Sequence, residues 1–103
     1  MLETFTKETF AAHLNTKVRV QVEEGDELEL ELVEATGDDF ESAKERGQLR
    51  FSALFRGPRD RFLIQRIYLM EHDELGTFEI FLVPVGQNES GFTYEAAFNR
   101  MLK

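Results

Sequence analysis

The sequence predicts a mainly β fold, a small antiparallel barrel or roll of about six strands with one N-terminal α-helix. Apolar and polar residues alternate with a period of two over most of the chain after residue 17, as expected for strands that bury one face. Glycines at positions 25, 37, 47, 57, 76, 86 and 91 separate these stretches, and such regular turn signals are typical of a small all-β domain.

One domain is expected over residues 1–103, because a chain of this length builds a single modest core. The predicted helix spans about 6–14, and the predicted strands span about 17–23, 27–34, 49–56, 62–72, 77–85 and 92–99. We expect the core to be formed by Phe10, Leu14, Val20, Leu30, Phe51, Phe55, Ile67, Phe78, Leu82, Tyr94 and Phe98.

The first residues carry the signals of a short helix. Thr6 is a candidate N-cap, and Phe5 and Phe10 have the spacing of a hydrophobic staple across the first turn. Phe10 and Leu14 then share one helix face. Asn15 is the predicted end of the helix.

A second interruption of the β pattern lies at residues 35–48. Asp39 as N-cap and Gly47 after the last turn frame about two helical turns. The sequence leaves a flexible loop open as the alternative.

Two neighbouring segments predict a β-hairpin. Residues 17–23 (KVRVQVE) alternate Val with polar side chains, residues 27–33 (ELELELV) alternate Leu with Glu, and a turn-forming cluster separates them. Both apolar rows must lie on one face. The expected register pairs Val20 with Leu30.

The row of glutamates on the second of these strands is expected to be a solvated face. That register sets Arg19 opposite Glu31, which gives the row a cationic neighbour. The row continues to Glu34 after a slip at Val33. Alternate residues on a strand are spaced by roughly 6.7 Å, so their carboxylates do not converge as a metal site requires.

Composition disfavours several classes of function. The net charge is −8 and the pI is near 4.7, so neither nucleic acid nor an anionic membrane is an expected partner. The chain has no Cys, which rules out disulfides and Cys-based metal sites. The N-terminus lacks a signal-peptide pattern, and no apolar stretch approaches the ~20 residues of a membrane span. A cytoplasmic location is therefore expected.

Catalytic motifs are absent from the sequence. The histidines are His13 and His72, and they form no metal-binding pair. Neither a GxSxG nucleophile motif nor a phosphate-binding glycine loop occurs. EHDE at residues 71–74 could suggest a metal, but an acidic turn after a strand is the commoner structure. We expect no enzyme activity, no metal and no cofactor.

Charge is divided between two parts of the chain. Residues 23–45 hold eleven acids and one base, whereas residues 46–66 hold six Arg and one acid. Arg56, Arg59 and Arg61 surround a Gly-Pro turn and form the candidate partner-binding site, because arginine binds carboxylates bidentately. The alternative is that these arginines pair with the acids of residues 23–45. Internal pairing is the expectation for two strand arginines, Arg50 and Arg66.

Four stretches resemble a family of small uncharacterised bacterial proteins, a domain of unknown function. They are MLETFT (1–6), LFRGP (54–58), IYLMEHDELGTFEIFLVPVG (67–86) and YEAAFN (94–99). The resemblance implies a compact bacterial domain and supplies no catalytic residues. It also suggests an accessory role beside phage-tail-like proteins.

The expected function is a non-catalytic protein-interaction or assembly-accessory module. Its partner is another, unidentified protein, and the sequence leaves a homo-oligomer open. The alternative is a small-ligand-binding β-barrel or minor enzyme, which requires a pocket with convergent polar groups. The chain has ten Phe, so we expect side chains to fill the barrel interior.

Overall fold

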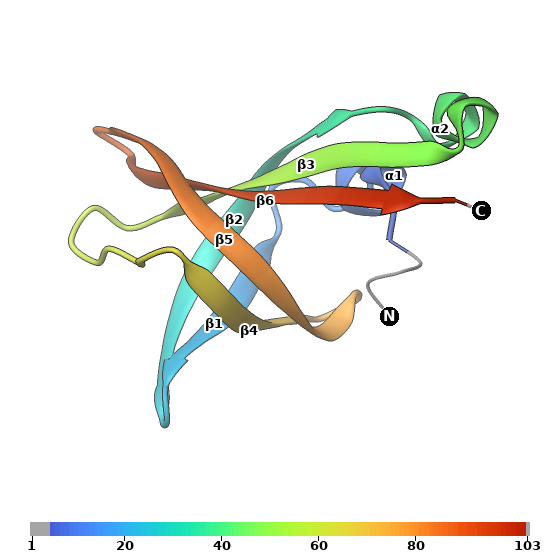
Figure 1. The fold of residues 1–103 in the computed structure, drawn as a ribbon. Coiled ribbons are helices and arrows are strands. Elements are labelled where there is room, and N and C mark those ends of the chain that lie inside the picture. The colour runs from blue at the N-terminus through green and yellow to red at the C-terminus, as the bar shows by residue number, and fades with distance from the viewer. Residues whose placement is uncertain (1–4, 103) are drawn as a thin grey trace.

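The computed structural model describes residues 5–102 and has six antiparallel strands in a closed barrel, which confirms the predicted fold class. The order around the barrel is β1-β2-β3-β6-β5-β4, and β4 closes on β1 (Figure 1). Residues 1–4, which belong to the family resemblance, lie outside the described part. The elements are α1 (Lys7–Ala11), β1 (Lys17–Glu23), β2 (Asp26–Gly37), α2 (Phe40–Arg46), β3 (Gln48–Gly57), β4 (Arg66–His72), β5 (Gly76–Asn88) and β6 (Gly91–Met101).

The predicted start of α1 is confirmed. Thr6 and Thr9 form a capping box, in which the side chain of each accepts a hydrogen bond from the backbone N–H of the other. Such a box satisfies amides that the first helical turn leaves without partners. The rings of Phe5 and Phe10 meet edge to face with centroids 5.4 Å apart, as the staple predicts.

The predicted end of α1 is wrong. The helix ends at Ala11 rather than near residue 14, and Leu14 is 37% exposed instead of buried. The chain turns at Asn15, which adopts a left-handed φ of 69°. Because residues 12–15 already form a turn, Leu14 does not continue the helix face on which Phe10 is buried.

The helical alternative is correct for the second interruption. α2 begins after Asp39, whose side chain accepts a hydrogen bond of 2.8 Å from the Ser42 amide. It ends at Arg46, and Gly47 is its C-cap with a left-handed φ of 80°, as the capping pattern predicts. The helix joins β2 to β3 at one end of the barrel (Figure 1).

The register of the first hairpin differs from the prediction by two residues. Val20 pairs with Leu28 rather than with Leu30. The turn is tighter than expected, because the last pair of the hairpin joins Glu23 to Asp26. Gly25, between them, adopts a φ of +79°. A shift of two keeps every side chain on its predicted face, so both apolar rows still point inward.

The strand predicted at 62–72 is shorter in the structure, and the residue predicted to face inward faces outward. β4 begins at Arg66, and Ile67 is 60% exposed instead of forming part of the core. Tyr68 and Met70 point inward and are at most 2% exposed. Apolar residues occupy both faces of this stretch, so alternation alone could not assign the inner one.

The segment that precedes β4 is held by tyrosine hydroxyls instead of a strand ladder. The backbone amide of Leu63 donates to the hydroxyl of Tyr94 at 3.0 Å, and the hydroxyl of Tyr68 donates to the carbonyl of Ile64 at 2.6 Å. These bonds satisfy backbone groups that a strand would have paired. The apolar run at this point therefore forms a loop.

Side chains fill the barrel interior. Phe10 of α1 is fully buried and makes ring contacts with Phe5, Phe51, Phe55, Phe78 and Phe98. Two residues of the predicted core, Leu14 and Ile67, are exposed instead of buried. A third, Phe98, is partly buried and packs against the hydrophobic core. The largest fully buried side chains are Tyr94, Phe10, Phe55, Leu30, Leu32, Leu49, Met70, Leu82, Val18 and Val20.

Candidate functional site

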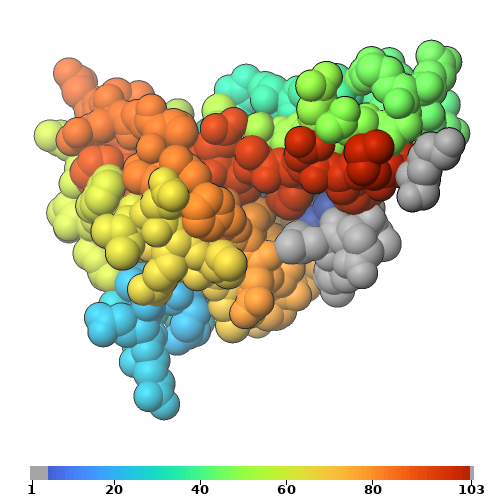
Figure 2. All heavy atoms as spheres, in the orientation of Figure 1, coloured from blue at the N-terminus to red at the C-terminus, as the bar shows by residue number. Residues whose placement is uncertain are grey.

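Large apolar side chains gather on one region of the outer surface, formed by β4, β5 and the loop before β4. Figure 2 shows this region, where the yellow segment meets the orange one. Contiguous exposed apolar surface is characteristic of interaction sites. We call the set the apolar face; its members are 43–60% exposed and are Phe62, Ile64, Ile67, Leu69, Phe81 and Val85.

The ladder between β4 and β5 makes part of this set contiguous. Ile67 is the cross-strand partner of Phe81, and Leu69 is the partner of Glu79. Opposed side chains on one face of an antiparallel pair lie about 5 Å apart at Cβ. In the loop, the Phe62 ring packs edge to face on Phe92 with centroids 5.0 Å apart. Sequence reasoning missed this face because it placed Ile67 inside the barrel.

A seam opens where β5 and β6 diverge. The pairing of β5 with β4 ends at Leu82, and its pairing with β6 begins at Val83. Residues 96–101 of β6 pair with β3 on one side, and on the other side no strand of the described chain pairs with them. A depression of about 350 Å³ lies here, lined by Ile67, Glu79, Ile80, Phe81, Ala97 and Phe98.

The three arginines of the predicted partner-binding site differ in their surroundings. Arg61 forms an ion pair of 3.0 Å with Asp26, which is one of the acids in residues 23–45. Arg59 is exposed and makes no side-chain hydrogen bond or ion pair with another described residue. Arg56 is half-buried, and its Nε atom is buried without a hydrogen-bond partner within residues 5–102.

Arg56 forms no ion pair with the carboxylate that the β2–β3 register places opposite it. Its cross-strand partner on β2 is Glu31, but the nearest cation to the Glu31 carboxylate is Lys17, whose Nζ lies 4.0 Å away. Lys17, Glu31, Arg56 and Ser90 line part of one depression of about 390 Å³. The Gly-Pro turn thus holds two arginines, Arg56 and Arg59, that lack an ion pair within the described chain.

The two strand arginines are both held internally, but in different ways. Arg50 lies 3.8 Å from the Asp38 carboxylate, as expected. Arg66 donates to the Val22 carbonyl at 2.9 Å and stacks over the Tyr68 ring at 4.6 Å. It therefore uses a carbonyl and an aromatic face instead of the expected carboxylate.

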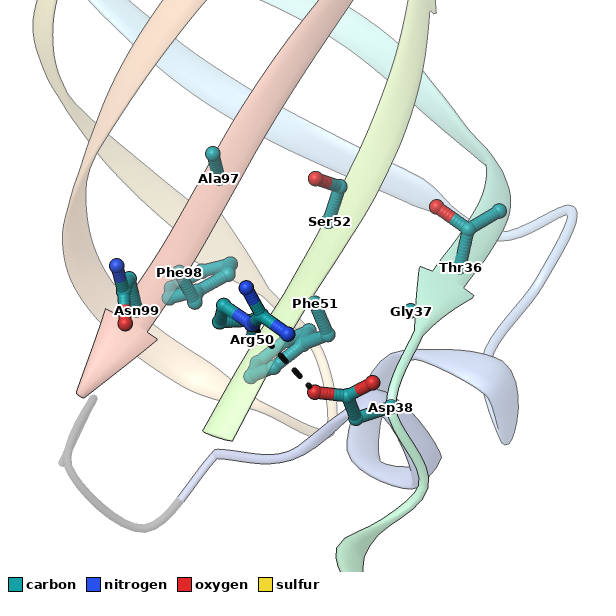
Figure 3. Close-up of a pocket in the computed structure, with 9 residues that line it drawn as sticks. All are labelled: Thr36, Gly37, Asp38, Arg50, Phe51, Ser52, Ala97, Phe98 and Asn99. Atoms are coloured by element: carbon teal, nitrogen blue, oxygen red, sulfur yellow. Dashed lines mark ion pairs between the residues drawn. The ribbon is translucent and has the colours of Figure 1, made fainter. Parts of the chain in front are cut away.

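A depression of about 380 Å³ lies over the ends of β2, β3 and β6. Figure 3 shows Arg50 reaching toward Asp38 at its rim, and the rings of Phe51 and Phe98 lying together below the strands. These rings are stacked at 4.5 Å. The floor of this depression is therefore part of the aromatic core.

The glutamate row on β2 does not converge on a point. Arg19 faces Glu29 in the ladder rather than the predicted Glu31, and its guanidinium turns to the other side, where it pairs with Glu71 at 3.3 Å and Asp73 at 2.9 Å. The predicted slip at Val33 is present as an irregularity in the β2–β3 ladder. Within residues 5–102 no group of three or more His, Cys, Asp or Glu is arranged to hold a metal ion.

His72 is buried and has a structural role. Its Nδ1 accepts hydrogen bonds of 3.0 Å from the backbone amides of Glu74 and Leu75. The ring proton must then lie on Nε2, which donates to the Thr16 hydroxyl at 2.9 Å. Burial, and secondly the neighbouring His13, lower the pKa of His72. This neutral imidazole organises the turn between β4 and β5.

Comparison with known proteins identifies a family. No curated protein and no solved structure matches the chain. Within the described part, no helix is long and apolar enough to cross a membrane. One family pattern matches residues 5–98, a span that includes the apolar face, the seam up to Phe98 and the arginine turn. The chain belongs to the family described as "Domain of unknown function (DUF6916)".

Proposed function

We propose that this chain is a non-catalytic module that binds another protein through the apolar face. The main support is the gathering of Ile67, Phe81 and the other exposed apolar side chains on one outer region. The chain as a whole is strongly charged, with 31% of its residues acidic or basic and a net charge of −8. Large apolar side chains exposed together on such a surface lower the free energy of association when a partner covers them.

The filled interior supports a surface role over internal ligand binding. Tyr94, Phe10 and Phe55 occupy the space inside the barrel and are at most 1% exposed. A ligand-binding barrel needs an internal cavity lined by a few convergent polar groups. The buried polar residue His72 has both ring nitrogens engaged by the protein itself. The alternative, a small-ligand-binding barrel or minor enzyme, thus receives less support.

Arg56 and Arg59 extend the proposed interface at one end. Arg56 lies at the end of β3, and Arg59 lies in the following loop together with Phe62, which belongs to the apolar face. Guanidinium groups without an internal ion pair are suited to bidentate bonds with Asp or Glu of a partner. The family resemblance suggests a setting, an accessory role in a phage-tail-like assembly.

The test is quantitative capture with a matched pair of variants. The immobilised wild-type chain and the double variant Ile67→Lys/Phe81→Lys are exposed to extract from the source cells, and retained proteins are identified by mass spectrometry. The control is Ala11→Lys/Ala12→Lys, which also replaces two exposed apolar residues by Lys, at the last residue of α1 and its C-cap. Thermal melting establishes that all three chains are folded.

We expect a protein that the wild type and the control retain and that the Ile67→Lys/Phe81→Lys variant loses. Adding two desolvated charges to the centre of an apolar interface is strongly unfavourable. Equal retention by all three folded chains would contradict the proposal, as would equal loss by both double variants.

A further inference from the structure

We propose that the partner adds an extended segment to the open edge of β6 at the seam, and that this segment alternates apolar with basic side chains. This inference rests on the proposed function and specifies its mode. Three features support it, namely the backbone at the edge, the shape and apolarity of the seam, and the charge beside it.

Within residues 5–102, no strand pairs with residues 96–101 of β6 on the side that faces away from β3. Residues 96–101 of β6 are extended and pair with β3 at every position. Because a strand directs alternate backbone N–H and C=O groups to its two sides, the side away from β3 presents its own row of donors and acceptors. β5 pairs with this side of β6 only from Gly91 to Glu95. An added strand would continue that ladder, which is the mode known as β-augmentation.

The seam is shaped and apolar enough to receive side chains. Ile67 and Phe81 form one wall on the β4–β5 side, and Ala97 and Phe98 form the other on β6. Ala97 is exposed and small, so it leaves room beside the Phe81 ring. Alternate side chains of an added strand point to the same face, so apolar residues at every second position would cover this surface.

The charges beside the seam indicate which side chains alternate with the apolar ones in the added segment. Glu79 lies at the seam and Glu95 at its closed end, and neither forms an ion pair with a described residue. Glu95 is half-buried, and its cross-strand neighbours, Leu54 and Val83, are apolar. A carboxylate in such surroundings gains from a cation that shares its desolvated environment. Lys or Arg in the added segment supplies that cation.

A second copy of this chain fits the seam less well. Each copy carries a net charge of −8, which opposes self-association. The edge segment 96–101 contains one base, Arg100, and its guanidinium donates to the carbonyl of Phe5 at 2.8 Å. A basic segment of a different protein is therefore the occupant that we propose.

The experiment uses synthetic peptides as probes. The first is KVRVQV with capped ends, in which Val alternates with Lys, Arg and Gln and which has the sequence of residues 17–22 of β1; the second is its acidic counterpart EVEVQV. The third is KVRVQV with every backbone amide N-methylated, which removes its hydrogen-bond donors. Amide hydrogen exchange of the full chain is followed by NMR with each peptide at millimolar concentration.

We expect KVRVQV to slow exchange at the seam-facing amides of residues 96–101 by about tenfold or more. The acidic peptide should bind more weakly, and the N-methylated peptide should give no protection. Each of the variants Glu79→Gln and Glu95→Gln should weaken the binding of KVRVQV about two- to fivefold, because each removes one charge pair. Neither substitution should change the binding of a neutral peptide, SVSVQV.

Several results would overturn strand addition. One is the absence of protection at residues 96–101 with KVRVQV, and another is equal protection by the N-methylated peptide. Protection that rises with protein concentration alone would assign the edge to a second copy instead. If these results appear while Ile67→Lys/Phe81→Lys still loses its captured partner, the interaction module stands and only the mode of binding is wrong.

Discussion

The side-chain hydroxyl of Thr16 lies 2.9 Å from Nε2 of His72. This contact joins the residue before β1 to the last residue of β4, next to the ladder that closes the barrel. On the other side of the ring, Nδ1 accepts from two amides of the following turn. His72 is 5% exposed, and its neutral form is the one that makes all three bonds.

Acid should destabilise the protein partly through His72. The folded chain lowers the pKa of His72, so its contribution to stability is fully present above the unfolded-state pKa of about 6.5. As the pH falls below that value, the unfolded chain binds a proton that the folded chain resists, and the free energy of unfolding decreases until the folded pKa is passed. Urea denaturation at about pH 7.5 and about pH 5.5 measures this loss.

His72→Asn separates this contribution from those of the carboxylates and of His13. The Asn oxygen can accept from the Glu74 and Leu75 amides but does not titrate. The variant should be less stable than the wild type at neutral pH, because it loses the bond to Thr16, and the difference should narrow as the pH falls. An unchanged difference at both pH values would show that His72 is not the responsible group.

Phe10→Ala should cost roughly 3–5 kcal/mol, because the ring is fully buried at the centre of the aromatic cluster and its removal leaves a cavity. Phe62→Ala, at a ring that is 54% exposed, should cost about 1 kcal/mol or less. Denaturant midpoints of the two variants test this ranking. Similar midpoints would mean that the barrel interior is packed differently from the structure.

Gly91→Ala should destabilise the chain by at least about 3 kcal/mol. Gly91 has a φ of +134°, and a Cβ there would collide with the carbonyl oxygen of Gly57. Gly25→Ala is the matched control, since its φ is also positive but a Cβ would meet nothing within 4 Å; it should cost about 1–2 kcal/mol. Equal costs would indicate that the β3–β6 approach is looser than described.

Arg59→Gln should affect partner retention and not stability, whereas Arg61→Gln should affect stability. Arg61→Gln removes the ion pair with Asp26 and should lower stability by about 0–1 kcal/mol. Arg59→Gln should leave stability unchanged, because no described residue pairs with it, and should weaken retention of the captured partner. If Arg59→Gln has no effect on retention, the arginine turn lies outside the interface.

Sequence reasoning predicted most of the fold because strong local signals agree with the final structure. Thr6, Asp39 and Gly47 mark helix ends by capping chemistry that acts over a few residues. The alternation of Val18 and Val20 with polar residues assigns an inner face without any knowledge of neighbours. The predicted capping and the predicted faces of the first hairpin are therefore correct.

The errors arose where a tertiary contact decides between two local choices. Ile67 and Tyr68 are both apolar enough to face inward, and the hydroxyl of Tyr68, which bonds to the Ile64 carbonyl, favours the inner position for the tyrosine. The apolar face follows from that reversed phase, so sequence alternation could not reveal it. The seam depends on where β5 changes partners from β4 to β6, which is a property of the closed barrel.

The most direct test of an interface on the apolar face is hydrogen–deuterium exchange of the full chain, alone and with the captured partner. We expect slower exchange in residues 62–69, 79–85 and 96–101, with the remaining strands unchanged. Protection confined to other regions, such as the β1–β2 hairpin or the depression beside Asp38 and Arg50, would contradict the proposed interface.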